Sequence, residues 1–364
     1  MGKVKEERET WRTRVAAAPM TAAIAALCGL GFLASLGPCI ATSGDPGGVA
    51  LESLWSLGEC RPSLVRVGAL ELARVWLDGE WWRVASTGLL HGSWIHLLLN
   101  IWSLVAVGEW AERLWGSGRL GVLFALCSVS GCLASLGWAE APMVVGASAG
   151  IFGIAGALLV ARVIGRPSTR EQLAPISVGM LGGCLAVLLA VGFFVPLIAQ
   201  AGHIGGLVAG LILGAAWARL PRRVDHLGVL GVGALCAGLV GAGRWPVGRG
   251  GFDEFVGYRL LEEQRFDEAG LALERALANR PDDAALANAV AYAFAEADTR
   301  LDRAKALVDG ALAAEPGNAD FLDTLGWVQC RRGEFAAGLA ALDAAEEASD
   351  QLIPEIDRHR QACR

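Results

Sequence analysis

The chain has little charge for its length. Only 19% of its 364 residues are Asp, Glu, Lys or Arg, while 54% are hydrophobic. An ordinary soluble enzyme is excluded, because soluble domains carry roughly 25% charged residues. The 48 glycines follow no three-residue period, which excludes collagen, and the nine cysteines are too few and too scattered for a disulfide-dense secreted scaffold.

The charges that are present divide the chain in two. Residues 1–249 hold 19 Lys or Arg and 14 Asp or Glu, whereas residues 250–364 hold 12 and 23. An apolar, slightly basic part is therefore followed by an acidic part. The acidic balance argues against nucleic acid as a partner and favours basic partners, although most charges of this kind only solvate a surface.

Runs without Asp, Glu, Lys or Arg fill most of the first part. They cover residues 15–44, 84–108, 120–139, 141–161, 172–218 and 227–243. A bilayer core about 30 Å thick is crossed by roughly 20 helical residues. Each run predicts one crossing, except that the longest is sufficient for two with a break near Pro196, which gives seven. The first run can alternatively be interpreted as a cleavable signal, but it is long enough to span.

The basic residues predict the orientation. With the N-terminus inside, Lys and Arg fall in the inside segments at 1–14, 109–119, 162–170 and 219–223. Short cytoplasmic loops are enriched in these residues. We therefore expect a multi-pass protein of a bacterial inner membrane, with a cytoplasmic N-terminal segment at 1–18 and the acidic part outside.

Two cysteine pairs fit that placement. Cys39 and Cys60 lie in the first outside loop, and Cys330 and Cys363 lie near the end of the chain. They could form disulfides in an oxidising compartment. Four unpaired thiols are an equal alternative.

The acidic part has an internal period. Three small or turn residues recur 35 positions later, so that Ala269, Ala276 and Pro281 return as Ala304, Ala311 and Pro316. A third copy covers residues 322–345. The pattern resembles the tetratricopeptide repeat, whose period is near 34. It predicts three helical repeats over 250–352, at 250–283, 284–318 and 319–352, with 353–364 as a C-terminal tail.

Ser148 and His203 are the first candidates for chemistry inside the membrane. Each lies seven residues into its run, which at 1.5 Å per residue puts both about 10 Å below the outer surface. An imidazole that takes the proton of a serine hydroxyl makes it a nucleophile. Phe152, one turn after Ser148, is placed to pack on that ring, and Gly206 and Gly210 allow two helices to approach closely. A purely structural role for Ser148 is a strong alternative, because membrane serines most often bond a carbonyl one turn back.

His96 and Asn100 are candidate donors to an oxyanion. They lie four residues apart on one helical face, and each such donor contributes roughly 3 kcal/mol in other enzymes. His91 is expected to point about 140° away from His96 on the same helix and to have a structural role.

Five ordered motifs carry a family resemblance. They are Glu80-Trp81-Trp82-Arg83, His91-x4-His96-x3-Asn100, Gly108-x3-Glu112-x3-Gly116, Gly146-Ala147-Ser148 and Gly202-His203-x2-Gly206-x3-Gly210. Together they make residues 65–220 resemble the rhomboid intramembrane serine proteases.

The resemblance implies a role for each matched residue. Ser148 corresponds to the nucleophile and His203 to the general base of a dyad. His96, Asn100 and the Ser148 backbone amide correspond to the oxyanion hole. Arg83 and Glu112 match positions that brace the first outside loop and the end of the second crossing.

The resemblance also implies a fold and a function. We expect an all-α fold: a transmembrane bundle of six core helices plus a seventh, over 19–245, followed by the soluble repeats. The expected activity is cleavage of single-pass membrane proteins within the lipid bilayer, after a small residue, without a metal or other cofactor. The repeats would bind a peptide or the soluble portion of a substrate.

One departure from the family keeps an alternative open. Ala149 and Gly150 stand in swapped order, because the family usually has glycine directly after the serine. The methyl group at Ala149 could crowd the helix crossing, so the alternative is a catalytically inactive scaffold that binds membrane helices and recruits partners. A zinc protease is disfavoured because no carboxylate or thiol accompanies the histidines, and a transporter with histidine proton relays is a further minor alternative.

Overall fold

The computed structural model describes residues 18–56, 60–76, 78–138, 143–194, 199–221, 224, 226–242, 249–349 and 354–363. The chain forms two compact units, Met1–Gly243 and Arg244–Arg364. The predicted cytoplasmic segment, up to residue 17, and the predicted break near Pro196 lie outside the described residues.

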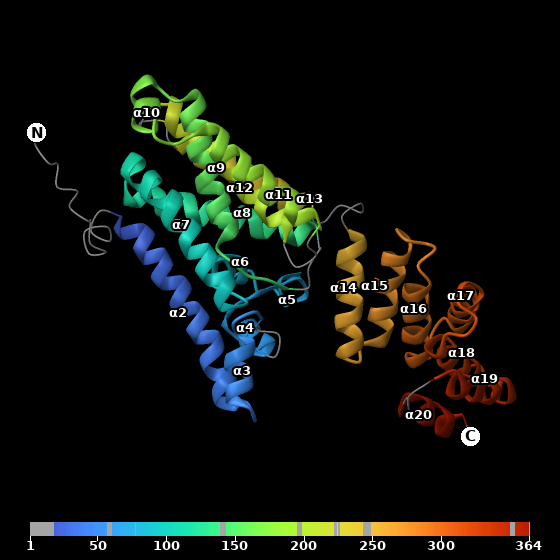
Figure 1. Cartoon of the computed structure of the whole chain (residues 1–364). Helices are drawn as coiled ribbons and strands as arrows, with labels where there is room; N and C mark the ends of the chain where they lie inside the picture. The colour runs from blue at the N-terminus through green and yellow to red at the C-terminus, as the bar shows by residue number, and fades with distance from the viewer. Residues whose placement is uncertain are drawn as a thin grey trace, which may run out of the picture. The chain divides into compact units, whose positions relative to one another are not determined.

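The first unit is a helix bundle (Figure 1). Its apolar helices are α2 (Pro19–Thr42), α7 (Trp94–Trp115), α8 (Ser117–Trp138), α9 (Ser148–Ile164), α11 (Val178–Phe194), α12 (Gln200–Arg219) and α13 (His226–Ala242), with the short α10 (Pro167–Gln172) between α9 and α11. Each of the seven overlaps a charge-free run of the sequence. Helix α7 extends beyond its run, because its last turns include Glu109, Glu112 and Arg113.

Four of these helices are long and apolar enough to cross a bilayer, namely Pro19–Thr42, Trp94–Trp115, Ser117–Gly137 and Gln200–Arg219. Three others are apolar but shorter, namely Ser148–Ile164, Val178–Phe194 and His226–Gly241. A helix of 17 residues, such as α9, is about 26 Å long. The protein is an integral multi-pass membrane protein.

The closest packing in the bundle is between α9 and α12. A Cβ at Gly206 would collide with the Ala149 carbonyl, and one at Gly210 with the Gly153 carbonyl. The two helices therefore touch backbone to backbone, as small residues permit in membranes. Helix α12 also packs on α8, and α13 packs on α12 and α8.

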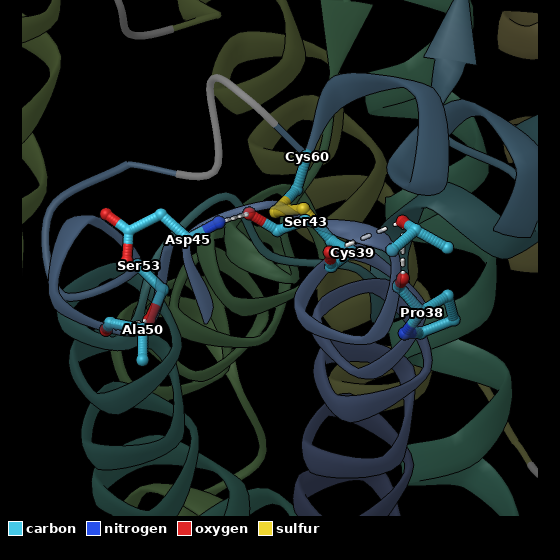
Figure 2. The surroundings of a disulfide bond; sticks show 8 residues. Pro38, Cys39, Ser43, Asp45, Ala50, Ser53 and Cys60 are labelled. Atoms are coloured by element: carbon cyan, nitrogen blue, oxygen red, sulfur yellow. Dashed lines mark hydrogen bonds between the residues drawn. A yellow bond between two sulfur atoms is a disulfide. The ribbon is translucent and has the colours of Figure 1, made fainter. Parts of the chain in front are cut away.

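Short elements connect α2 to α7. They are α3 (Pro46–Glu52), α4 (Arg61–Val67), β1 (Leu70–Glu71), α5 (Leu72–Trp76), α6 (Arg83–Ser86) and the 3-10 helix η1 (Thr87–Leu89). A disulfide between Cys39 and Cys60 joins the end of α2 to the start of α4 (Figure 2). The strand β1 pairs antiparallel with β2 (Met143–Val144), which lies just before α9.

The second unit consists of antiparallel helices that pack in chain order. They are α14 (Arg249–Glu262), α15 (Phe266–Leu277), α16 (Ala284–Glu296), α17 (Leu301–Ala314), α18 (Ala319–Arg331), α19 (Phe335–Ala348) and α20 (Pro354–Ala362). Glycines lie where helices cross: a Cβ at Gly270 would be 2.5 Å from the ring of Phe294.

The residues expected to form a C-terminal tail are a packed helix in the structure. Helix α20 lies against α18 and α19, and Cys363 after it forms a disulfide with Cys330 in α18. Its mostly polar sequence has no apolar period, which is why the pattern did not predict a packed element. Both cysteine pairs are disulfides, which resolves the alternative left open by the sequence.

Candidate active site

The side chains of Ser148 and His203 meet between α9 and α12. Ser148 is the first residue of α9, and His203 lies in the first turn of α12. The Ser148 Oγ and His203 Nε2 atoms are 2.8 Å apart, a hydrogen-bond distance. Both residues are half-buried. An imidazole in this position can accept the hydroxyl proton as the oxygen attacks a carbonyl.

An aromatic ring holds the imidazole in place. The rings of Phe152 and His203 are stacked, with centroids 4.3 Å apart and an interplanar angle of 9°. Phe152 is buried one turn after Ser148, so α9 supplies both contacts of the imidazole. The Nδ1 atom of His203 is buried and has no hydrogen-bond partner among the described residues.

The segment before Ser148 turns past the side chain of His96. Gly146 has a φ of +133°, a conformation that favours glycine. A Cβ built on Gly146 would lie 2.9 Å from Cε1 and 3.0 Å from Nε2 of His96. The same Cβ would lie 3.7 Å from Ser148 Oγ. Gly146 thus permits the turn into α9 and lets His96 approach the hydroxyl.

Asn100 lies one turn after His96 on α7. Ser93 caps the helix, since its Oγ accepts a hydrogen bond of 3.1 Å from the His96 amide. The Asn100 Nδ2 donates to the His96 carbonyl oxygen at 2.9 Å. This bond uses one of the two amide hydrogens and leaves the other for a different acceptor.

The expectation that His91 and His96 point to different sides of one helix is wrong. Helix α7 begins at Trp94, because Ser93 caps it, so His91 precedes the helix. The two imidazoles pack edge to face with centroids 5.1 Å apart, and His91 is fully buried. His91 therefore supports the ring of His96.

The depth argument for Ser148 is also wrong in its premise. Helix α9 starts at Ser148 and does not reach back toward residue 141. The preceding residues Met143–Val144 are extended and pair with β1. The contact with His203 thus depends on the loop that leads into α9, while residues 139–142 lie outside the described part.

Comparison with known proteins finds a family that is similar to the part of the chain containing this pair. Residues 78–220 match the family described as the Rhomboid domain. Over 154 residues the chain is 36% identical to rhomboid protease GluP of Bacillus subtilis, covering 42% of this chain and 29% of that protein. We refer to residues 78–220, the part of the chain that matches this family, as the rhomboid domain.

Two further relatives are similar over a comparable length of the chain. RHOMBOID-like protein 5 of Arabidopsis thaliana is 34% identical over 160 residues, covering 43% of this chain and 50% of that protein. Rhomboid-like protease 5 of Toxoplasma gondii is 35% identical over 170 residues, covering 45% and 19%. The chain spans half or less of the length of these relatives.

In the rhomboid domain, the methyl group of Ala149 faces α8. A Cβ at Gly131 in α8 would lie 2.5 Å from the Ala149 Cβ and 2.5 Å from the Gly202 carbonyl oxygen. The glycine in α8 therefore makes room for the alanine. Sequence analysis missed Gly131, because nothing in the sequence relates it to a residue of another helix.

Arg83 of the rhomboid domain is buried beside the first loop. Its Nη1 donates to the carbonyl oxygens of Val65 at 2.5 Å and Ala69 at 3.0 Å. Its Nε bonds Glu80 at 2.5 Å. The guanidinium thus ties the end of α4 to α6.

Glu112 joins the ends of two helices. It accepts hydrogen bonds from the backbone amides of Met20 at 2.7 Å and Thr21 at 2.9 Å, in the first turn of α2. The hydroxyls of Thr21 and Ser117 also donate to it, at 2.8 and 2.6 Å. A carboxylate at a helix N-terminus satisfies amides that have no partner within the helix.

Sequence analysis missed Thr87 in η1. Its buried hydroxyl donates to the Val144 carbonyl oxygen and accepts from the Leu70 amide at 3.2 Å. Its own carbonyl oxygen accepts from the Gly146 amide at 3.2 Å. Thr87 therefore fixes both strands and the turn just before Ser148. No sequence signal marks it, because the partners of its hydroxyl are backbone groups of distant segments.

Among the described residues, no three His, Cys, Asp or Glu side chains gather closely enough to hold a metal ion.

Proposed function

We propose that the rhomboid domain is a serine intramembrane endopeptidase that uses a dyad of Ser148 and His203. The hydrogen bond of 2.8 Å between Ser148 Oγ and His203 Nε2 carries this proposal. The names of the Bacillus and Toxoplasma relatives as proteases support it.

The dyad accounts for both steps of hydrolysis. Ser148 Oγ attacks the carbonyl carbon of the substrate and gives its proton to His203 Nε2. The C–N bond then breaks, and His203 transfers that proton to the leaving amine, which leaves an ester on Ser148. In the second step His203 takes a proton from water and the hydroxide attacks the ester carbon. The bond between that carbon and Ser148 Oγ then breaks, the carboxylic acid product leaves, and His203 returns the proton to Ser148 Oγ.

In this proposal, three donors stabilise the developing oxyanion. The backbone amide of Ser148 lies at the first turn of α9, where amides have no partner within the helix. The imidazole of His96, which approaches Gly146 just before that turn, and the second amide hydrogen of Asn100 are the other two. Donors fixed before the reaction stabilise the tetrahedral intermediate without reorganisation.

The half-buried dyad suits a membrane substrate. Water reaches the pair from the aqueous side, while the flanking helices face lipid. The proposed substrates are single-pass membrane proteins cut near the outer end of the span, with a small residue before the cleaved bond.

The alternative of an inactive scaffold was suggested by Ala149. Its methyl group lies near Gly131 on α8, and Ser148 and His203 are at hydrogen-bond distance with Ala149 in place. This contact favours an active protease over the scaffold.

Cleavage of a model single-span substrate tests the proposal. Wild type, Ser148→Ala and His203→Ala are compared in detergent and in liposomes, with Ser177→Ala as the matched control. Ser177 is exposed at the start of α11, where its hydroxyl accepts from the Met180 amide. The two dyad variants should lose cleavage while the control keeps it. Equal cleavage rates for wild type and Ser148→Ala would contradict the proposal.

The second unit is, in this proposal, a tetratricopeptide-like domain that binds a protein partner. Three helix pairs in series, α14–α15, α16–α17 and α18–α19, support it. Removing 250–364 should leave cleavage of short substrates intact and change which full-length proteins are cut. Loss of all cleavage on truncation would instead assign the unit a role in folding.

Both disulfides support an outside location for the second unit. The helices α7, α8, α9, α11, α12 and α13 separate Cys60 from Cys330. Six crossings return the chain to the side on which it started, so one oxidising compartment accommodates both disulfides. In spheroplasts of an expressing bacterium, external protease should digest the second unit, and full protection would contradict this orientation.

A further inference from the structure

Helix α20 covers α16 and α18 through polar contacts. Ile356 is its one large apolar side chain and is 3% exposed. Three later residues of α20, namely Arg358, His359 and Arg360, are basic and contact carboxylates of α16, α18 and α19. These polar contacts accompany the apolar packing of Ile356 and Cys363.

The imidazole of His359 is the centre of the contact. It is fully buried and stacks on Trp327, with ring centroids 4.6 Å apart and an angle of 9°. Its Nδ1 lies 2.8 Å from Asp323 Oδ1, and its Nε2 lies 3.5 Å from Glu296 Oε1. A single side chain of α20 is thus held by groups of both α16 and α18.

The guanidinium of Arg358 enters beside it. Its Nη2 donates to Glu296 Oε1 at 2.6 Å and to the Tyr292 hydroxyl at 3.3 Å. Hydrogen bonds between ionised groups are the strongest of the ordinary ones. We call the site around these two side chains the acidic aromatic cradle. It consists of two aromatic and two acidic residues of the repeats, namely Tyr292, Glu296, Asp323 and Trp327.

We infer that the acidic aromatic cradle is a binding site for a cationic helical segment, and that α20 occupies it as an internal ligand in the oxidised protein. The partner would carry an arginine followed by a cationic ring or second basic residue, with an apolar residue one half-turn earlier. This rests on the proposal that the second unit binds a protein partner, and it names the face and the chemistry of that partner.

The disulfide between Cys330 and Cys363 controls whether α20 occupies the acidic aromatic cradle. Cys330 lies one turn after Trp327 on α18, and Cys363 lies one turn after His359, so their disulfide closes the same contact from the side. While it is intact, α20 cannot leave the cradle. Reduction makes α20 a ligand held only by non-covalent contacts, which a partner can then replace.

The charge of His359 strengthens the same contact. Burial tends to lower the pKa of His359, but the hydrogen bonds to Asp323 and Glu296 outweigh burial and raise it. Arg358 on the same helix opposes this rise, since its Nη2 is 3.0 Å from the His359 Nε2. Tyr292 faces the ring from α16 at 6.3 Å and stays neutral, since burial and then Glu296 raise its pKa to about 12. The contact is therefore weakened as pH rises through the pKa of His359.

A peptide-binding experiment on the full chain tests the cradle. The probe is a labelled synthetic peptide with the sequence of residues 354–363, carrying Cys363→Ser. The receptor is a full-length variant with Arg358→Ala, His359→Ala and Cys363→Ser, in which α20 has lost its cations and its disulfide. Fluorescence anisotropy should show binding to this variant at least about tenfold tighter than to the oxidised wild type.

Charge neutralisation supplies the control. Adding Glu296→Gln and Asp323→Asn to the receptor should weaken peptide binding by at least about tenfold. Adding Asp309→Asn and Glu315→Gln removes the same number of charges from α17 and the turn after it and should leave binding unchanged. The inference would be overturned if the peptide does not bind the receptor variant, or if both pairs of substitutions weaken peptide binding equally.

Hydrogen exchange of the unmodified chain tests the occupancy without any substitution in the cradle. Protection of the α20 amides, corrected for intrinsic rates, should fall by about tenfold or more on reduction and fall further from about pH 6 to about pH 8.5. The amides of α15 serve as the internal reference. If α20 keeps its protection under both changes, the internal-ligand account is wrong. Neither measurement uses proteolysis, so failure here leaves the protease proposal standing.

Discussion

Glycines determine how closely other groups approach Ser148. Gly206 and Gly210 let α12 touch α9, Gly131 makes room for Ala149, and Gly146 makes room for His96. The hydrogen bond between the dyad residues therefore depends on backbone contact between helices.

Gly206→Ala should displace α12 and break the contact of His203 with Ser148. Its Cβ would collide with the Ala149 carbonyl, which cannot move away as a flexible side chain could. Overpacking of this kind costs about 1–3 kcal/mol or more. Cleavage assays and thermal unfolding should both show the loss. Gly233→Ala on α13, which meets nothing within 4 Å, should change neither.

Thr87→Val should slow cleavage about tenfold or more, through kcat rather than KM, because it leaves buried backbone groups of β1 and β2 unpaired at a cost of about 1–3 kcal/mol. The turn before Ser148 would then lose its position. Thr87→Ser keeps the hydroxyl and should restore the rate. A purely structural role would lower the amount of folded Thr87→Val protein and leave kcat of its folded fraction unchanged.

At the level of elements, polar side chains fasten the ends of helices. Glu112 holds the start of α2 against the end of α7, and Arg83 holds α4 against α6. The apolar faces set which helices pack together. The hydrogen bonds of Glu112 and Arg83 set the position along each helix at which the helices pack.

Glu112→Gln should lower the stability of the rhomboid domain by about 1–3 kcal/mol, because charge-assisted bonds to the amides of Met20 and Thr21 are weakened. Thermal unfolding in detergent measures this. Glu109→Gln, three residues earlier, removes only a surface pair with Arg113 and should have little effect. Equal stability of the two variants would contradict the role of Glu112.

The sequence predicts the helices better than their ends. Charge-free runs locate all seven apolar helices, since hydrocarbon excludes charge. The start of α9 at Ser148 was missed, because it depends on pairing of β2 with the distant strand β1. No local pattern contains that strand pairing. His91 was placed on α7 for a different reason, since the local cap at Ser93, which starts the helix at Trp94, was not used.

On the scale of the whole chain, two units carry different chemistry and each contains one disulfide. In the chain-entropy account, loops closed over 21 and 33 residues stabilise by about 3–4 kcal/mol each. The first disulfide holds the loop segment that leads to β1. The second holds α20, whose packing the composition of residues 354–363 does not predict.

The stability of the second unit should depend on pH through α20. His359 has a raised pKa, so its contribution is complete below the ordinary value of 6.5 and is lost as pH rises through the raised value. Burial opposes ionisation of Glu296, but hydrogen bonds from His359 and Arg358 lower its pKa to about 2. The contribution of Glu296 to the free energy of unfolding is therefore complete above pH 4.5 and is lost at lower pH. Calorimetry should find maximal stability between these limits, and His359→Gln should flatten the decline above the upper one.

The central claim is that Ser148 is a nucleophile activated by His203. Labelling by a fluorophosphonate, located by mass spectrometry, measures this without any assumption about substrate. The account predicts a phosphonylated Ser148 in the wild type and in Ser177→Ala, and no label in His203→Ala. Folded wild-type protein that takes up no label at Ser148, or a His203→Ala variant labelled as fast as wild type, would contradict it.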